Sequence, residues 1–136
     1  CDDFFELHDE EELKLVKSFI WYAPFFMKKM AHTKRFADML LGNYALHNNE
    51  EKQVQFGAFT AEPGDGSIYV SFMGTDDSLI GWKEDFNMSF IRPIPSQLEA
   101  AEYVNETIKY SRRKIRLGGH SKGGNLAIYA AVKAKP

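Results

Sequence analysis

The chain has 136 residues, of which 44% are hydrophobic and 26% charged, and its formal net charge is −2. This length and composition predict one domain, residues 1–136, with a single core, and they exclude a strongly basic nucleic-acid-binding protein. Cys1 is the only cysteine, so the chain can form no internal disulfide, and no run is long enough for a membrane span. The first residues are acidic where a signal peptide is basic, so we expect a cytoplasmic protein without stable membrane insertion.

Residues 1–42 are predicted to be a helical segment. Asp9 followed by three glutamates is typical of a helix start, and apolar residues then recur at helical spacing. A second apolar stripe predicts a helix from Phe25 to Leu41, with Gly42 as its C-cap. Such a stripe of Phe and Met most often packs in a core, and a mobile lid over a lipid substrate is the alternative.

Two strands are predicted next, and the region 53–136 should contain the strands and helices of the fold. Residues 53–58 alternate between apolar and polar, which indicates a strand with one buried and one wetter face. Residues 68–73 are nearly all apolar and predict a strand buried on both faces. The turn sequence of residues 63–66 lies between them, so we expect the two strands to pair antiparallel.

Along the chain, helices are expected both before and after a third strand. Residues 78–86 should be helical, and Ser96-Gln97-Leu98-Glu99 reads as a capping box that opens the next helix. The apolar face expected on that helix consists of Leu98, Ala101, Val104 and Ile108. A strand at residues 114–117 and a helix at residues 125–134 complete the pattern. Strands alternating with helices predict an α/β fold.

The turn between that last strand and helix carries the strongest motif, Gly119-His120-Ser121-Lys122-Gly123. A G-x-S-x-G turn from strand to helix is typical of a nucleophile elbow, in which a strained serine projects above the sheet. Gly119 and Gly123 would be needed because a Cβ there would collide with neighbouring backbone. An oxyanion would meet the Lys122 N–H and the positive end of the helix dipole. A phosphate-binding turn is the alternative, but the phosphate-loop pattern G-x-x-x-x-G-K-[ST] is absent.

Two segments of the sequence, taken together, resemble the class 3 lipases of the α/β-hydrolase fold. They are Phe72-Met73-Gly74-Thr75-Asp76 with Trp82-Lys83-Glu84-Asp85-Phe86, and Gly119 to Ala127. The sequence is closer still to a bacterial lipase-like family of that superfamily without an assigned substrate, over roughly residues 36–134.

The resemblance implies an α/β-hydrolase-type sheet with flanking helices. It implies Ser121 as nucleophile and the backbone of Thr75 and Lys122 as oxyanion donors. Class 3 lipases usually have arginine at the position of Met73 and leucine at the position of Lys122. The lysine is therefore expected to place a cation at the mouth of the site.

The catalytic triad is incomplete in this sequence. In α/β-hydrolases the acid and the histidine follow the serine in the chain, but the residues after Ser121 include no Asp, Glu or His. The upstream histidines are expected at the surface, and His120 is too constrained by the turn to face its neighbour. Acidic residues near the second motif are expected to cap a helix (Asp76, Asp77) or to form structural ion pairs or hydrogen bonds (Glu84, Asp85). We therefore expect a truncated N-terminal portion of the fold, with acid and base supplied by a longer parent.

The leading hypothesis from sequence is a serine hydrolase, esterase-like or lipase-like, that cleaves a carboxylic ester through an acyl-enzyme on Ser121. A catalytically inactive hydrolase fold that serves as a binding or interaction module is the alternative. We expect no metal and no cofactor. The expected partners are a small acyl-ester or lipid substrate and, further, the remaining part of a parent chain or a second copy.

Overall fold

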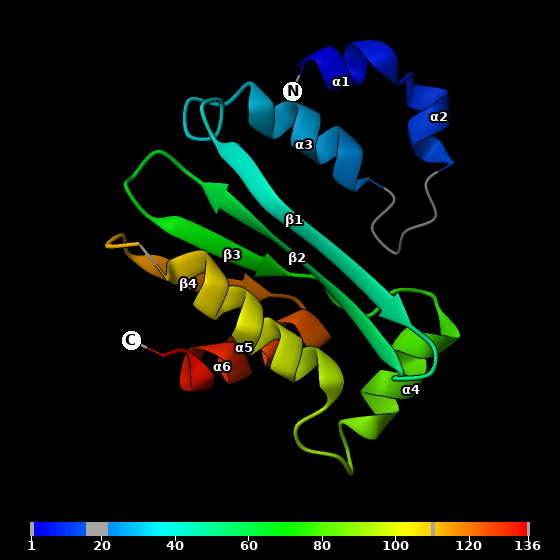
Figure 1. Cartoon of the computed structure of the whole chain (residues 1–136). Coiled ribbons are helices and arrows are strands. Elements are labelled where there is room, and N and C mark those ends of the chain that lie inside the picture. Colours follow the sequence, from blue (N-terminus) through cyan, green and yellow to red (C-terminus); the bar gives the residue numbers. More distant parts are fainter. Residues whose placement is uncertain (1, 16–21, 110, 136) are drawn as a thin grey trace. The chain divides into compact units, whose positions relative to one another are not determined.

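The structure is a computed structural model that describes residues 2–15, 22–109 and 111–135 (Figure 1). It contains two compact units, Cys1–Met39 and Leu40–Pro136. Every strand among the described residues lies in the second unit, which also holds both segments that carry the sequence motifs.

The first unit is helical. It contains α1 (Asp2–Leu7), α2 (Glu10–Lys14) and α3 (Ala23–Ala31). The helix start predicted at Asp9 is confirmed, because its carboxylate accepts a hydrogen bond from the Glu12 N–H at 2.7 Å and caps α2. The continuation predicted from helical spacing falls on Val16 and Ile20, which lie outside the described residues.

The prediction of one helix from Phe25 to Leu41 is wrong. Helix α3 ends at Ala31, and the Thr33 hydroxyl donates to the Met30 carbonyl at 2.8 Å, a local bond that competes with further helix. Leu40 to Asn49 forms strand β1, so Gly42 lies in a strand rather than at a helix cap. Pairing with a neighbouring strand satisfies the β1 backbone, and this tertiary contact overrides the local helical pattern.

The second unit is built on a mixed four-stranded sheet of order β1-β2-β3-β4. Its further strands are β2 (Val54–Glu62), β3 (Ile68–Phe72) and β4 (Ile115–Gly119). The predicted antiparallel pairing of β2 with β3 is confirmed, and β3 pairs with β4 in parallel, with Phe72 opposite Gly119. The carboxyl ends of β3 and β4 therefore lie side by side, and each leads into one of the two sequence motifs.

Three helices flank this sheet, which gives the predicted α/β arrangement. They are α4 (Leu79–Asn87), α5 (Pro95–Ile108) and α6 (Lys122–Lys133). Helices α5 and α6 lie next to each other and cover one face of the sheet (Figure 1). The core beneath them is formed by Phe56, Ala58, Val70, Phe72, Ala100, Val104, Leu126, Ala127 and Ala130.

The burial of two strands differs from the prediction. In β2 the polar Gln55 and the Gly57 next to Phe56 are buried as well, so this strand is covered on both faces. In β3, by contrast, Tyr69 remains 37% exposed. The sequence pattern reports side-chain polarity, whereas burial is set by what packs on each face. Here a buried polar network covers Gln55 and the Met73 side chain covers Gly57.

Helix α5 begins slightly earlier than predicted. Pro95 occupies its first turn, where a missing N–H costs nothing, and the N-cap is Ile94, whose N–H donates to the Gln97 side chain at 3.0 Å. The buried face carries Ala100 and Val104, and the predicted Leu98 is 53% exposed. Leu98 lies two residues from Ala100, about 200° around the helix, so it points away from the face that Ala100 and Val104 share.

The turn between β2 and β3 is attached to β4 through charge. The Asp65 carboxylate accepts from the Ser67 N–H at 3.0 Å and from the Arg116 guanidinium at 2.7 Å. The Ser67 hydroxyl, and after it the guanidinium, hold the pKa of the Asp65 carboxyl well below its usual range. The folded state therefore favours the charged form of Asp65.

We expect the free energy of unfolding of Asp65→Asn to depend less on pH, below neutral pH, than that of the wild type. A depressed folded-state pKa stabilises the fold above the unfolded value of about 3.9, and this contribution is lost as the pH falls toward the folded value. The wild-type advantage over the variant, measured by urea unfolding at a series of pH values, should be largest near neutral pH and shrink below about pH 4. Asp77→Asn removes an exposed charge from a loop and is the control. An advantage that is constant with pH would contradict the prediction.

Candidate active site at the strand-to-helix turn

The turn between β4 and α6 holds one serine in unusual backbone geometry. Strand β4 ends at Gly119, α6 begins at Lys122, and Ser121 has φ 55° and ψ −125°. A side chain with this backbone conformation costs on the order of 1–3 kcal/mol and persists where surrounding structure imposes it, often at functional sites. Ser121 is also exposed. The strand, turn and helix predicted around it are present.

The two glycines of the motif let backbone segments approach each other closely. A Cβ on Gly119 would lie 2.5 Å from the Gly123 carbonyl carbon, and a Cβ on Gly123 would lie 2.3 Å from the Phe72 carbonyl oxygen. Both distances are too short for any side chain. The start of α6 therefore rests directly on the ends of β3 and β4, which fixes where Ser121 points relative to the next loop.

The loop that follows β3 lies against the serine turn. A Cβ built on Gly74 would be 3.0 Å from the His120 carbonyl oxygen and 3.8 Å from the Ser121 Cβ. Thr75, the next residue, is thus placed beside the turn, although it is far from Ser121 in sequence. In the described part of the chain, the backbone N–H groups of Thr75 and Lys122 donate to no other residue.

The side chain of Thr75 is held by helix α4. Its hydroxyl donates to the Asp85 carboxylate at 2.5 Å, and the second oxygen of Asp85 is buried without a partner among the described residues. Ser78 caps α4 by accepting the Gly81 N–H at 3.0 Å. The prediction that Asp76 or Asp77 caps this helix is wrong, since Asp76 instead accepts from the Ser78 N–H at 2.9 Å. The Asp76 carboxylate therefore bonds to the residue that caps α4 and does not cap the helix itself.

The expectation that Lys122 places a cation at the mouth of the site is also wrong. The Lys122 side chain is fully buried, and its ammonium lies 2.9 Å from the Glu84 carboxylate. It also donates to the carbonyl of Gln55 at 2.6 Å and to the oxygen of the Gln55 side chain. A carboxylate and two neutral oxygens replace the water that a buried ammonium loses, and this set of acceptors draws the side chain inward. The expectation of structural ion pairs or hydrogen bonds for Glu84 and Asp85 is confirmed.

Sequence reasoning missed this buried network. Its members come from β2, α4 and α6, and no short-range pattern joins residues so far apart in the chain. The sequence offered one indication of this network, Lys122 itself, which is a charged residue at a position where class 3 lipases usually have leucine.

The histidines do not complete a triad within the second unit. His47 on β1 lies 2.9 Å from the Glu99 carboxylate, and His120 is exposed in the turn itself. Within Leu40–Pro136, no described histidine or carboxylate hydrogen-bonds the Ser121 hydroxyl. In the first unit, His8 lies 3.0 Å from Glu12.

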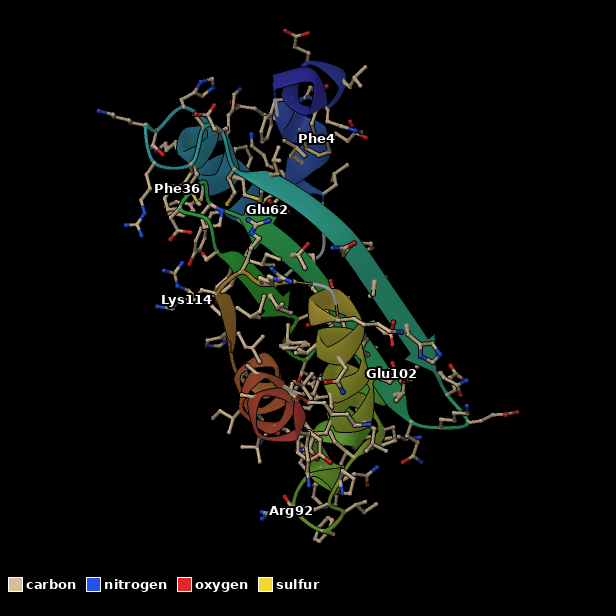
Figure 2. The ribbon with its side chains drawn as sticks, turned by 60° about the vertical axis from the view of Figure 1, so that its left-hand side comes forward. Phe4, Phe36, Glu62, Arg92, Glu102 and Lys114 are labelled. Carbon is tan, nitrogen blue, oxygen red and sulfur yellow. The ribbon has the colours of Figure 1, made fainter. Side chains whose placement is uncertain are left out.

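Three basic residues, Arg112, Arg113 and Lys114, precede β4 in the sequence. Lys114 lies at the start of β4 (Figure 2), whereas Ser121 follows the end of that strand. Arg113 in this cluster donates to Glu62 at 2.7 Å and to the Ser67 carbonyl at 2.8 Å. Arg113 therefore connects the end of β2 with the start of β3, away from the serine turn.

The surroundings of the serine turn can be compared with two other features of the described residues, their metal-binding side chains and one cavity. Over residues 2–15, 22–109 and 111–135, no three metal-binding side chains gather in one place. A cavity of about 410 Å³ lies between α5, α6 and β4, lined by apolar residues such as Ile115, Leu117 and Ile128. Its lining includes no residue of the turn, so it is separate from Ser121. None of the described helices has both the length and the apolar character required to cross a membrane.

Comparison with models of protein families gives a match to most of the chain. The family model described as Mbeg1-like matches residues 30–136, a range that includes the sheet, the loop after β3 and the serine turn. No curated protein and no solved structure matches the chain.

Proposed function

Since the chain belongs to the Mbeg1-like family, whose description names no activity, we propose a function from the site itself: a serine hydrolase that cleaves a carboxylic ester through Ser121. The single observation that carries this proposal is the exposed Ser121 in strained geometry, with the Gly74–Thr75 loop lying against its turn. A buried or relaxed serine would give no reason to expect nucleophilic chemistry.

In the proposed reaction, the Ser121 hydroxyl oxygen attacks the carbonyl carbon of an acyl ester or lipid while a general base takes its proton. The negative charge on the carbonyl oxygen is stabilised by the N–H groups of Lys122 and Thr75 and by the N-terminus of α6. Collapse of the tetrahedral intermediate breaks the ester C–O bond, and the base returns the proton to the leaving alcohol. A water molecule then attacks the carbonyl carbon of the acyl-Ser121 ester while the base takes its proton. The bond to the Ser121 oxygen breaks, the base returns the proton to that oxygen, and the carboxylic acid is released.

The parallel β3–β4 pair and the strand-to-helix turn support an α/β-hydrolase-type fold for this function. Under the proposal, the general base and its acid come from a longer parent protein, as expected from sequence. The hydrogen bond of Thr75 to Asp85 supports the oxyanion role, because it fixes the residue that carries one of the two donors.

A second candidate function is a binding or interaction module that has the hydrolase fold but no catalysis. It is favoured by one observation: among the described residues of the second unit, no base is hydrogen-bonded to the Ser121 hydroxyl. An unactivated serine hydroxyl is a weak nucleophile.

Covalent labelling separates the two candidates. We expect a fluorophosphonate probe to label the folded full-length protein, and mass spectrometry of the digested protein to place the adduct on Ser121. Heat-denatured protein is the control, because unfolding removes the oxyanion donors but keeps the hydroxyl. A folded protein that takes up no label would reject the hydrolase and favour the binding module.

A further inference from the structure

A fully buried ion pair lies directly behind the serine turn. The side chains of Lys122 and Glu84 both have 0% exposure, and their charged atoms are 2.9 Å apart. The pair joins the first residue of α6 to the middle of α4, and Gln55 of β2 completes it. Three structural elements thus meet at one ammonium group.

The hydrogen-bonding capacity of the Lys122 ammonium is saturated. The three N–H donors of the ammonium have three acceptors, one carboxylate oxygen and both oxygens of Gln55. The Glu84 carboxylate further accepts the Gln55 N–H and the Ser96 N–H, each at 3.0 Å. A buried ammonium whose three donors are all satisfied favours a single geometry of the groups that accept from it.

Stability alone is a poor reason for such a pair. The desolvation of two charges offsets much of their attraction, and well-packed apolar residues in the same place are often as stable or more so. A role in fixing geometry remains as the better explanation for a lysine at this position.

The network reaches both sides of the proposed oxyanion site. On one side, Lys122 adjoins Ser121 and supplies the first N–H donor. On the other side, Glu84 adjoins Asp85, which holds Thr75, and the Gln55 amide donates to the Gly74 carbonyl at 3.4 Å. Moving the pair would therefore shift the two donors relative to each other.

We infer that the Lys122–Glu84 pair is a positioning device that sets the distance between the two halves of the oxyanion site. This inference rests on the proposed hydrolase function. Neither side chain touches the substrate in this role, and each acts through the backbone next to it. Misplacing a reacting or stabilising group by about 1 Å can lower a rate about a hundredfold, so a small shift suffices.

The test compares the rate constant of fluorophosphonate labelling with the unfolding temperature, both measured on the full-length protein. Lys122→Met leaves Glu84 buried and unpaired, so both the unfolding temperature and the labelling rate should fall. The double variant Lys122→Met with Glu84→Leu should regain most of the unfolding temperature because no buried charge remains. Its labelling rate should stay at least about tenfold below that of the wild type. Lys133→Met, an exposed lysine on the same helix, is the control and should change neither quantity.

The outcomes separate the inference from the function on which it rests. Recovery of the labelling rate together with the unfolding temperature in the double variant would reduce the pair to a structural role and overturn the inference. A wild-type protein that takes up no label would reject the hydrolase proposal itself. Should that double variant fail to fold, Lys122→Met combined with Glu84→Gln gives the same decision. This variant removes both buried charges but keeps a side-chain oxygen at position 84 for the Gln55 and Ser96 N–H groups. Its labelling rate should also stay at least about tenfold below that of the wild type, and a wild-type rate would overturn the inference.

Discussion

Replacing Ser121 with glycine is expected to abolish labelling and ester hydrolysis and, at the same time, to make the protein more stable by about 1–2 kcal/mol. Glycine adopts φ 55° and ψ −125° without the steric cost that a Cβ imposes there. The hydroxyl of Ser121 makes no capping hydrogen bond to α6, so its removal costs the helix nothing. Urea unfolding measures the gain, and an ester assay on the full-length protein measures the loss.

Ser121→Ala is the matched control for this trade. It removes the same hydroxyl but keeps the Cβ, so activity should disappear while the free energy of unfolding stays close to that of the wild type. If the glycine and alanine variants had equal stability, the serine would carry no backbone strain, and the main observation behind the proposed function would lose its force.

Gly123→Ala is expected to destabilise the second unit by about 3 kcal/mol or more. The new Cβ would lie 2.3 Å from the Phe72 carbonyl oxygen and 3.0 Å from Met73 backbone atoms. Backbone cannot rotate away as a flexible side chain does, so α6 must move off the strand ends. Because Ser121 and Lys122 move with α6, labelling should also be lost in the fraction that remains folded. Chemical denaturation and labelling of the same samples measure both effects.

Gly42→Ala provides the comparison at a position without such crowding. Its Cβ would meet only the Thr60 hydroxyl, at 3.6 Å, which is an ordinary contact. We expect a change within about 0.5 kcal/mol for this variant. A Gly123→Ala protein as stable as Gly42→Ala would show that the start of α6 is not pressed against the strands.

The local part of the site could be predicted from the sequence. Gly119 and Gly123 are needed because backbone segments approach each other closely at this turn. The spacing of the two glycines around Ser121 is local in sequence, so it predicts this close approach. The antiparallel pairing of β2 and β3 was equally accessible, because a short turn of strong sequence character joins them.

The parts that could not be predicted depend on contacts between distant residues. The sequence pattern predicts Leu40 and Leu41 at the end of a helix and no element for residues 43–49, yet pairing with β2 makes Leu40 to Asn49 a strand. Likewise, the direction of the Lys122 side chain is decided by Glu84 and Gln55, which lie on other elements. A charged residue in a turn is solvated in most proteins, so its burial could not be read from its type.

The parallel pairing of β3 and β4 also has a consequence for the order in which the protein folds. Strands joined by a short hairpin, such as β1 and β2, can pair early in folding. Strand β4 can pair with β3 only after the long segment between them, which contains α4 and α5, has brought the two strands together. Thr75 and Ser121 sit on opposite sides of that loop closure. We therefore expect the two halves of the proposed site to come together late in folding. Partial opening of the crossover should separate Thr75 from Ser121 while the β1–β2 hairpin remains formed.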